Sequence, residues 1–300
     1  MDIRALLLGT AFAAMWSSAF ATARVIVAHA PPLGSLSLRF LISGLIAVVI
    51  AWLLGQTWRL APRQAWAVIL LGLCQNALYL GLNFVALQSV EASLAAIIAA
   101  SMPLIAAALA WVVFREKVSP LGLAGLAAGF AGVGLIMGTR LSGGADPFGI
   151  ALCVGGSVAL AVATLTIRGA ATGGNLLMVV GLQMLVGSVV LGAISAMFET
   201  ISVTVSPAFL AAFAYQIFVP GLTATLIWFA LVGRIGSTRA STFHFLNPFF
   251  GIAIAAVLLG ERIRPLDILG VAVAMAGILA VQMARSRPGV AAATPDSSKY

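Results

Sequence analysis

The stretch Phe114-Arg-Glu-Lys-Val-Ser-Pro120 recurs 145 residues later as Leu259-Gly-Glu-Arg-Ile-Arg-Pro265. At the same offset Met102-Pro103 aligns with Asn247-Pro248, and no gap is needed between the two matches. Shared hydrophobicity does not by itself bring a Glu, a basic residue and a Pro into step, so we interpret the match as an internal duplication. The chain is therefore predicted to consist of two related halves.

The composition around these stretches is that of a membrane protein. The chain is 62% hydrophobic and 8% charged, with a mean hydropathy of +1.14, whereas a soluble domain carries about 25% charged residues. A membrane-spanning helix needs about 20 mostly apolar residues. Cutting the chain at its charged residues leaves ten suitable intervals: Ala5 to Ala23, Phe40 to Trp58, Gln64 to Val90, Ala92 to Phe114, Val118 to Thr139, Pro147 to Ile167, Gly169 to Phe198, Thr200 to Gly233, Ala240 to Gly260 and Ile268 to Ala284. We predict an all-α polytopic membrane protein with ten transmembrane helices.

Ten spans in two related halves give five spans per half, and an odd number reverses the direction of the second half. The prediction is an inverted-topology repeat, with residues 1–140 as the first copy, 146–285 as the second, and 286–300 as a disordered cytoplasmic tail. Exchange of conformations between such halves converts a site open on one side into one open on the other. Some inverted repeats are channels, so this argument for transport is partly an analogy.

The basic residues indicate the orientation, because cytoplasmic loops carry an excess of Lys and Arg. With a cytoplasmic N-terminus, 11 basic residues fall inside and 5 outside. The inside set is Arg4, Arg59, Arg63, Arg115, Lys117, Arg168, Arg234, Arg239, Arg285, Arg287 and Lys299, and the outside set is Arg24, Arg39, Arg140, Arg262 and Arg264. Both termini are predicted to be cytoplasmic, and the net charge of +8 reflects topology rather than nucleic-acid binding.

The repeated linker also resembles a known family. The run 115–120, the glycine-rich Leu121 to Gly138 after it, the counterpart 260–265 and Trp16-Ser17-Ser18 are similar to the drug/metabolite transporter superfamily, and more closely to its ten-helix exporters with two EamA-type domains. The resemblance covers residues 4 to 285. It implies a bacterial inner-membrane carrier with a central cavity lined by helices 1, 3, 4, 6, 8 and 9. Within the family the chain is most similar to the amino-acid exporters, including the aromatic amino-acid branch.

Polar residues in the third helix point to such a cavity. Asn76, Tyr79 and Asn83 follow i, i+3, i+7 spacing and would share one face of an α-helix. Polar groups are costly in lipid, so this face is predicted to point inward and to bind substrate. The alternative is that the amides bond to neighbouring helices.

The ninth helix carries a second polar group next to a proline. Pro248 cannot donate to the carbonyl of His244, so one turn is predicted to present a free carbonyl, the imidazole and the Asn247 amide together. Its counterpart Pro103 is predicted to break the fourth helix. The alternative is that each proline marks only a packing kink.

Three further helices contribute candidates for a mainly apolar pocket. They are Trp16 and Ser17 in the first helix, Thr164 in the sixth and Trp228 in the eighth. The aromatic residues of the first helix form a stripe of a kind that more often serves packing or lipid contact than ligand binding. No Arg or Lys is expected at the centre of a span, which favours neutral or zwitterionic solutes over polyanions.

The acidic residues bear on energy coupling. All eight lie at helix ends, in linkers or in tails, whereas proton-driven carriers use a carboxylate within the membrane. We therefore favour facilitated diffusion, or a step assisted by His244, over a carboxylate relay.

The predicted function is export of small neutral or zwitterionic metabolites, amino acids foremost, by alternating access through a central cavity. A channel and a lipid- or drug-handling protein are the alternatives. An enzyme is disfavoured because the only histidines, His29 and His244, form no cluster with an acid, so no catalytic residue, metal or cofactor is expected. The expected partners are a small-molecule substrate and the bilayer. A monomer is expected, although the glycine stripe of the fifth helix leaves a dimer open.

Overall fold

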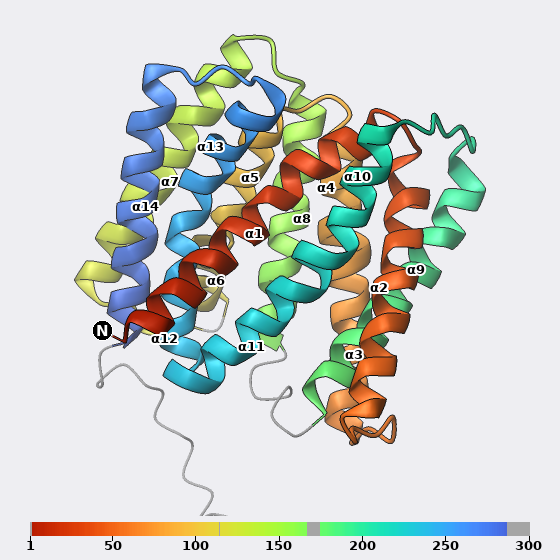
Figure 1. The fold of residues 1–300 in the computed structure, drawn as a ribbon. Helices are drawn as coiled ribbons and strands as arrows, with labels where there is room; N and C mark the ends of the chain where they lie inside the picture. Colours follow the sequence, from red (N-terminus) through yellow and green to blue (C-terminus); the bar gives the residue numbers. More distant parts are fainter. Residues whose placement is uncertain (1, 114, 167–174, 287–300) are drawn as a thin grey trace, which may run out of the picture.

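The computed structural model describes residues 2–113, 115–166 and 175–286, and ten helices in these ranges are long and apolar enough to cross a membrane (Figure 1). The uninterrupted ones are α1 (Ile3–Val27), α2 (Pro32–Leu53), α7 (Pro120–Ser142), α8 (Pro147–Thr166), α9 (Leu176–Phe198) and α14 (Pro265–Ser286). The composite ones are span 3 with α3 (Pro62–Leu71), η1 (Gly72–Leu80) and α4 (Gly81–Ala86); span 4 with α5 (Ala92–Ala100) and α6 (Met102–Val112); span 8 with α10 (Pro207–Gln216), η2 (Ile217–Thr223) and α11 (Ala224–Ile235); and span 9 with α12 (Ser237–Ser241), η3 (Thr242–Leu246) and α13 (Asn247–Leu259). The described residues contain no strand. The all-α, ten-span prediction is confirmed, and the tail beyond Ser286 lies outside the described residues.

The second helix begins earlier than predicted. It starts at Pro32 rather than Phe40, so Arg39 lies about two turns inside it. Proline suits the first turn of a helix because its φ is already helical and its missing N–H has no partner there. Arg39 is buried among other helices, and a charged residue in such a place does not mark a helix end.

Helix boundaries recur at the offset seen in the sequence. The matching starts, each pair 145 residues apart, are Pro62 and Pro207, Gly72 and Ile217, Met102 and Asn247, and Pro120 and Pro265. Spans 3 and 8 both pass into a π-helix at the same place, η1 and η2. Related sequence therefore produces related interruptions in both halves.

Two pairs of helices form the edges of the bundle. Figure 1 shows α7 beside α14 at the left and α2 beside α9 at the right, with α1 crossing between them. Helix α1 contacts α10, α11 and α13, while span 3 packs against α8 and α9. We call the side where α1 begins the N-side face. The opposite side, with connections 28–31, 87–91, 143–146, 199–206 and 260–264, is the far face.

Glycines allow both edge pairs to approach closely. A Cβ on Gly132 of α7 would lie 2.6 Å from the backbone of Ala274 and of Gly270 in α14. A Cβ on Gly181 of α9 would lie 2.9 Å from the nitrogen of Val48 in α2. The glycine stripe of α7 therefore packs within its own chain, as small residues do in membrane helix interfaces.

Large apolar side chains cover the outside of the bundle. Val189 and Val257, for example, are 73% and 83% exposed, and many Leu, Ile, Phe and Trp residues accompany them. A soluble monomer rarely exposes such continuous apolar surface, whereas lipid requires it. The chain is a multi-pass membrane protein.

Candidate functional site

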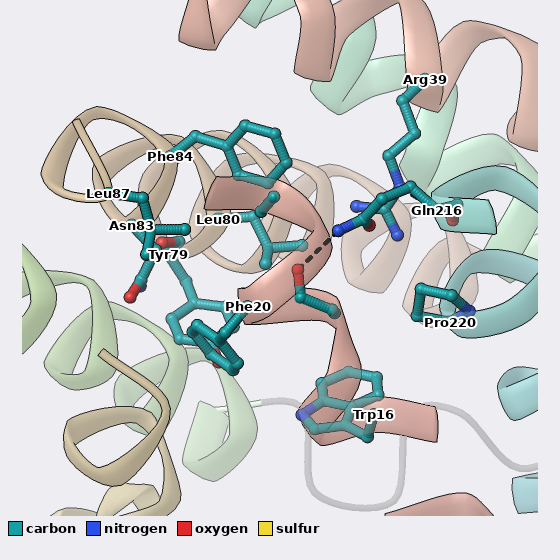
Figure 2. A pocket seen from close by; sticks show the side chains of 12 residues that line it. Trp16, Phe20, Arg39, Tyr79, Leu80, Asn83, Phe84, Leu87, Gln216 and Pro220 are labelled. Atoms are coloured by element: carbon teal, nitrogen blue, oxygen red, sulfur yellow. Dashed lines mark hydrogen bonds between the residues drawn. The ribbon is translucent and has the colours of Figure 1, made fainter. Parts of the chain in front are cut away.

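A small pocket of about 40 Å³ lies between α1, α2, span 3 and span 8 (Figure 2). Its lining consists of Trp16, Ala19, Phe20, Ala23, Arg39, Tyr79, Leu80, Asn83, Phe84, Leu87, Gln216 and Pro220. Ligand pockets usually measure about 300 Å³ or more, so this one is contracted and has room for only a few water molecules. Of the predicted site residues, Trp16, Tyr79 and Asn83 line it.

The π-helices shape two walls of this pocket. Such segments are rare and occur frequently at functional sites. In span 8, Pro220 has no N–H to donate to the carbonyl of Gln216 four residues earlier. The Arg39 Nε of α2 donates to that carbonyl at 3.2 Å. In a π-helix the carbonyl instead pairs with the N–H five residues later, so the guanidinium adds a contact between α2 and the start of η2.

The expectation that no basic residue is central is wrong. Arg39 is only 5% exposed and lines the pocket. The signal that could have revealed it is Pro31-Pro32, because a helix that starts there needs about 20 residues to cross and must contain Arg39.

Gln216 connects span 8 to α1 at the pocket. Its Nε2 donates to the Ala19 carbonyl at 2.6 Å and to the Thr22 hydroxyl at 2.9 Å. Figure 2 shows Gln216 and Arg39 on one side of the pocket, with Tyr79 and Asn83 on the other. Sequence reasoning missed Gln216, which has no motif around it.

Span 3 separates the three residues that α-helical spacing predicted to share one face. Tyr79 and Asn83 line the pocket, and the Asn83 Nδ2 donates to the Tyr79 carbonyl at 2.8 Å. Asn76 instead donates to the Gln183 carbonyl of α9 at 2.8 Å. The wider turn of η1 changes the angular spacing on which the prediction depended.

A second group, the aromatic cluster, consists of Phe12, Trp228 and His244. The ring centroids lie 4.8 Å apart for Phe12 and Trp228, 5.4 Å for Phe12 and His244, and 5.3 Å for Trp228 and His244. Trp16 lies 5.8 Å from Phe12, so it stands between this cluster and the pocket. Trp228 and His244 thus lie together, apart from Tyr79 and Asn83.

Asn247 holds the aromatic cluster to α1. Its side-chain Nδ2 donates to the His244 Nδ1 at 3.0 Å, and its backbone carbonyl accepts from the Ser17 hydroxyl at 3.2 Å. The predicted free carbonyl of His244 is not free, because the Asn247 N–H bonds to it in the tighter 3₁₀ turn of η3. Pro248 then lies in the first turn of α13.

The remaining two candidates make local contacts. Pro103 lies in the first turn of α6, directly after the interruption at Ser101. The Thr164 hydroxyl donates to the Leu160 carbonyl of its own helix at 2.8 Å, and Thr164 does not line the pocket.

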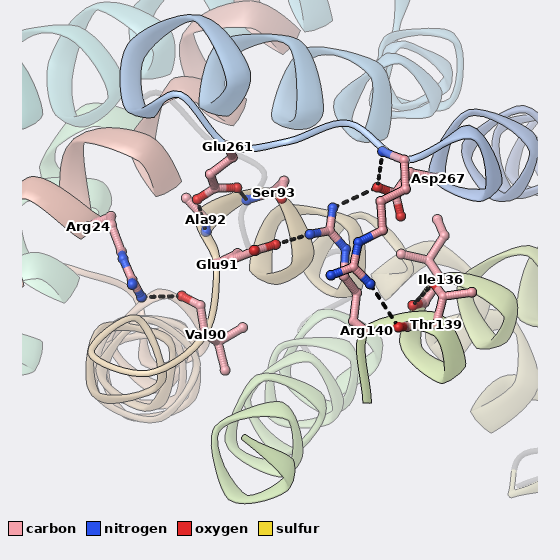
Figure 3. A network of polar contacts seen from close by, with 11 residues as sticks. Arg24, Val90, Glu91, Ala92, Ser93, Ile136, Thr139, Arg140, Glu261 and Asp267 are labelled. Atoms are coloured by element: carbon pink, nitrogen blue, oxygen red, sulfur yellow. Dashed lines mark hydrogen bonds and ion pairs between the residues drawn. The ribbon is translucent and has the colours of Figure 1, made fainter. Parts of the chain in front are cut away.

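A polar network joins the two halves at the far face (Figure 3). Arg140, at the end of α7, pairs with Glu91 and also with Asp267 of α14, the latter at 2.7 Å. Arg140 and Asp267 are 3% and 0% exposed. In addition, the Arg264 Nη1 donates to the Thr139 carbonyl at 2.9 Å. Buried opposite charges thus hold α7 against α14.

Carboxylates also cap helices across the halves. The Glu261 carboxylate accepts from the first two N–H groups of α5, at 2.7 and 3.0 Å, and Glu199 accepts from two N–H groups in the first turn of α2, each at 2.9 Å. Negative charge is favourable at a helix N-terminus. Asp146 precedes α8, and a hydrogen bond from the Ser89 hydroxyl lowers the pKa of its carboxyl group.

Comparison with known proteins identifies relatives over nearly the whole chain. The family described as the EamA-like transporter family matches residues 3–138 and 147–283. The uncharacterized transporter YvbV of Bacillus subtilis is 28% identical over 251 residues, 82% of this chain and 81% of the relative. The uncharacterized transporter sll0355 of Synechocystis sp. is 25% identical over 294 residues, 88% and 85% of the two chains.

Two further similarities support less, one because it covers a short segment and the other because its sequence identity is low. A probable amino-acid metabolite efflux pump of Salmonella typhimurium is 39% identical over 64 residues, which is 21% of each chain. A protein of known crystal structure aligns with a TM-score of 0.68 at 21% identity, covering 95% of this chain and 99% of its own. At that identity the likeness supports the fold alone.

Proposed function

The chain belongs to the EamA-like transporter family, and on that premise we propose that it exports small neutral or zwitterionic metabolites, amino acids foremost, across a bacterial inner membrane. The observation that carries the proposal is the contracted pocket between spans of both halves. It combines the aromatic rings of Trp16 and Phe20 with the polar groups of Arg39 and Gln216. Such a lining suits a small solute with an apolar side chain and a polar head. The short match to an amino-acid metabolite efflux pump supports the same substrate class.

Alternating access by an inverted repeat is the proposed mechanism. The two stretches matched to the family and the recurring helix boundaries support the duplication, and five spans per copy require the second copy to enter from the opposite side. The edge pairs α7 with α14 and α2 with α9 join corresponding helices. Because backbone atoms meet there across glycines, we expect these pairs to stay together while the spans around the pocket move.

The N-side face is proposed to be cytoplasmic. Its described basic residues are Arg4, Arg59, Arg63, Arg115, Lys117, Arg234, Arg239 and Arg285. Those at the far face are Arg24, Arg140, Arg262 and Arg264. Burial of Arg39 within α2 removes it from the outer set and strengthens the bias on which the positive-inside rule depends.

We propose that transport occurs by facilitated diffusion, without coupling to a proton gradient. Within the described residues every carboxylate lies at the end of a helix or in a connection, and the buried Asp267 is in the first turn of α14, paired with Arg140. A mobile proton carrier would need a carboxylate along the substrate path. Uptake that depends on an imposed pH gradient would contradict this mode.

Counterflow in proteoliposomes tests the proposed function. Vesicles preloaded with an unlabelled neutral amino acid should accumulate the labelled one transiently and with saturation. A channel would give flux without stimulation from the opposite side. Absence of saturable uptake for every neutral amino acid would reject the substrate class. The lipid-facing Val257→Ala serves as a control and should behave like the wild type, since Val257 is 83% exposed.

Variants at Trp16 and Asn76 distinguish a residue that contacts substrate from a residue that packs helices together. We expect Trp16→Ala to lower kcat/KM about tenfold or more with little change in Tm, because Trp16 lines the pocket. Asn76→Ala should instead lower the stability by about 0.6 kcal/mol, typical of an interhelical hydrogen bond in a membrane, with KM unchanged. Transport kinetics and thermal unfolding of the two purified variants provide the comparison. The reverse assignment of effects would remove Trp16 from the site.

A further inference from the structure

The charge of Arg39 has no counter-ion in the part of the chain that the structure describes. The buried charged side chains there are Arg39, Arg140 and Asp267. Arg140 and Asp267 pair with each other, whereas no described carboxylate lies within 4.0 Å of Arg39. An unpaired buried charge is strongly unfavourable, so natural proteins pair it or use it.

The position of Arg39 leaves most of its hydrogen-bonding capacity to the pocket. Among the described residues only its Nε has an acceptor, the Gln216 carbonyl at 3.2 Å. The Cζ lies 5.0 Å from the centroid of the Phe40 ring, within the range of a cation–π contact. Four N–H bonds on the two Nη groups remain for another partner.

Two residues that line the same pocket also carry amide oxygens without a hydrogen-bond partner in the described part of the chain. The Gln216 Oε1 and the Asn83 Oδ1 are buried without a hydrogen bond, and their residues are 0% and 1% exposed. The donor sides of both amides are occupied, by α1 for Gln216 and by the Tyr79 carbonyl for Asn83. Buried acceptors without donors are costly and occur where a ligand or water completes them.

We propose that the pocket recognises both charges of an α-amino acid, with Arg39 binding the carboxylate and the oxygens of Gln216 and Asn83 accepting from the ammonium group. This deepens the function proposed above and rests on it. A guanidinium binds a carboxylate through two parallel hydrogen bonds, which a lysine cannot reproduce. The apolar side chain of the substrate then lies among Phe20, Phe84 and Trp16. Entry of the substrate requires the contracted pocket to widen.

A structural role of Arg39 is the competing explanation, since its Nε joins α2 to the Gln216 carbonyl of span 8. The two explanations differ in what they predict for ligands. A structural loss would weaken all ligands equally, whereas loss of a carboxylate partner weakens only ligands that carry a carboxylate. The ratio of affinities between matched analogues is therefore the informative measurement.

The experiment measures inhibition of labelled phenylalanine counterflow by phenylalanine, by phenethylamine, which lacks the carboxylate, and by 3-phenylpropionate, which lacks the ammonium group. On the wild type we expect both analogues to inhibit about 30-fold more weakly than phenylalanine, as for removal of one partner of a buried charged contact. In Arg39→Gln the difference between phenylalanine and phenethylamine should fall to a few-fold. Arg39→Lys should be intermediate, because the charge remains but the fork is lost.

A second basic residue, at the far face near the pocket, provides the control. Arg24 of α1 donates to the carbonyls of Leu87 and Val90 and does not line the pocket, so Arg24→Gln should leave the analogue ratio unchanged. Equal inhibition by phenylalanine and phenethylamine on the wild type, or an unchanged ratio in Arg39→Gln, overturns the role of Arg39. If Arg39→Gln does not fold, the wild-type series and Arg39→Lys still test whether Arg39 binds the carboxylate. Absence of any saturable amino-acid counterflow on the wild type would instead reject the proposed function.

Discussion

Gly132→Val is expected to prevent the protein from reaching its native fold. The first atom of the new side chain would lie 2.6 Å from backbone atoms of α14, which cannot turn aside as a flexible side chain can. Overpacking typically costs about 1–3 kcal/mol, and contact with backbone places this change at about 3 kcal/mol or more. Size-exclusion profiles of detergent-solubilised protein should show loss of the monodisperse peak.

Gly134→Val provides the matched control for that experiment. Gly134 lies two residues further along α7, and a Cβ there meets no atom within 4 Å. This variant should be produced and behave like the wild type. Equal yields and equal Tm values for the two variants would contradict the close packing of α7 on α14.

Asp267→Asn is expected to be nearly as harmful. It leaves the buried Arg140 with Glu91 as its one ion-pair partner among the residues that the structure describes, and the Glu91 side chain is 44% exposed. Removing one member of a buried pair costs about 3–5 kcal/mol, because the remaining charge stays buried. Thermal unfolding in detergent should show a clearly lower Tm.

A double variant tests whether the cost comes from the unpaired charge. Arg140→Met combined with Asp267→Asn should lose less stability than the two single variants together, since neither charge of the pair is then left alone. Asp2→Asn is the control, because the pair of Asp2 with Arg234 is exposed and screened by solvent. Additive losses in the double variant would indicate that Arg140 and Asp267 are not coupled.

The candidate site was only partly predictable from the chain. Tyr79, Asn83 and Trp16 line the pocket and were identified because polar or amphipathic residues inside an apolar span are conspicuous. Arg39 and Gln216 were missed for opposite reasons. The charge of Arg39 was interpreted as the end of a helix, and Gln216 stands alone without a motif. Asn76 has the correct spacing for an α-helix, but the π-helix of span 3 directs it to α9.

The sequence by itself determined the ten spans, their composition and the offset of 145 residues. These features depend on hydrophobicity, on proline and glycine, and on duplication, which are local or repeated properties of the chain. Only the tertiary structure decided which polar groups meet. Arg39 contacts the Gln216 carbonyl across 177 positions of sequence, and Arg140 contacts Asp267 across 127. The physical reason is that a single charged or amide side chain has no periodicity, so its partner is selected by helix packing and by the angular shift that π- and 3₁₀-turns introduce.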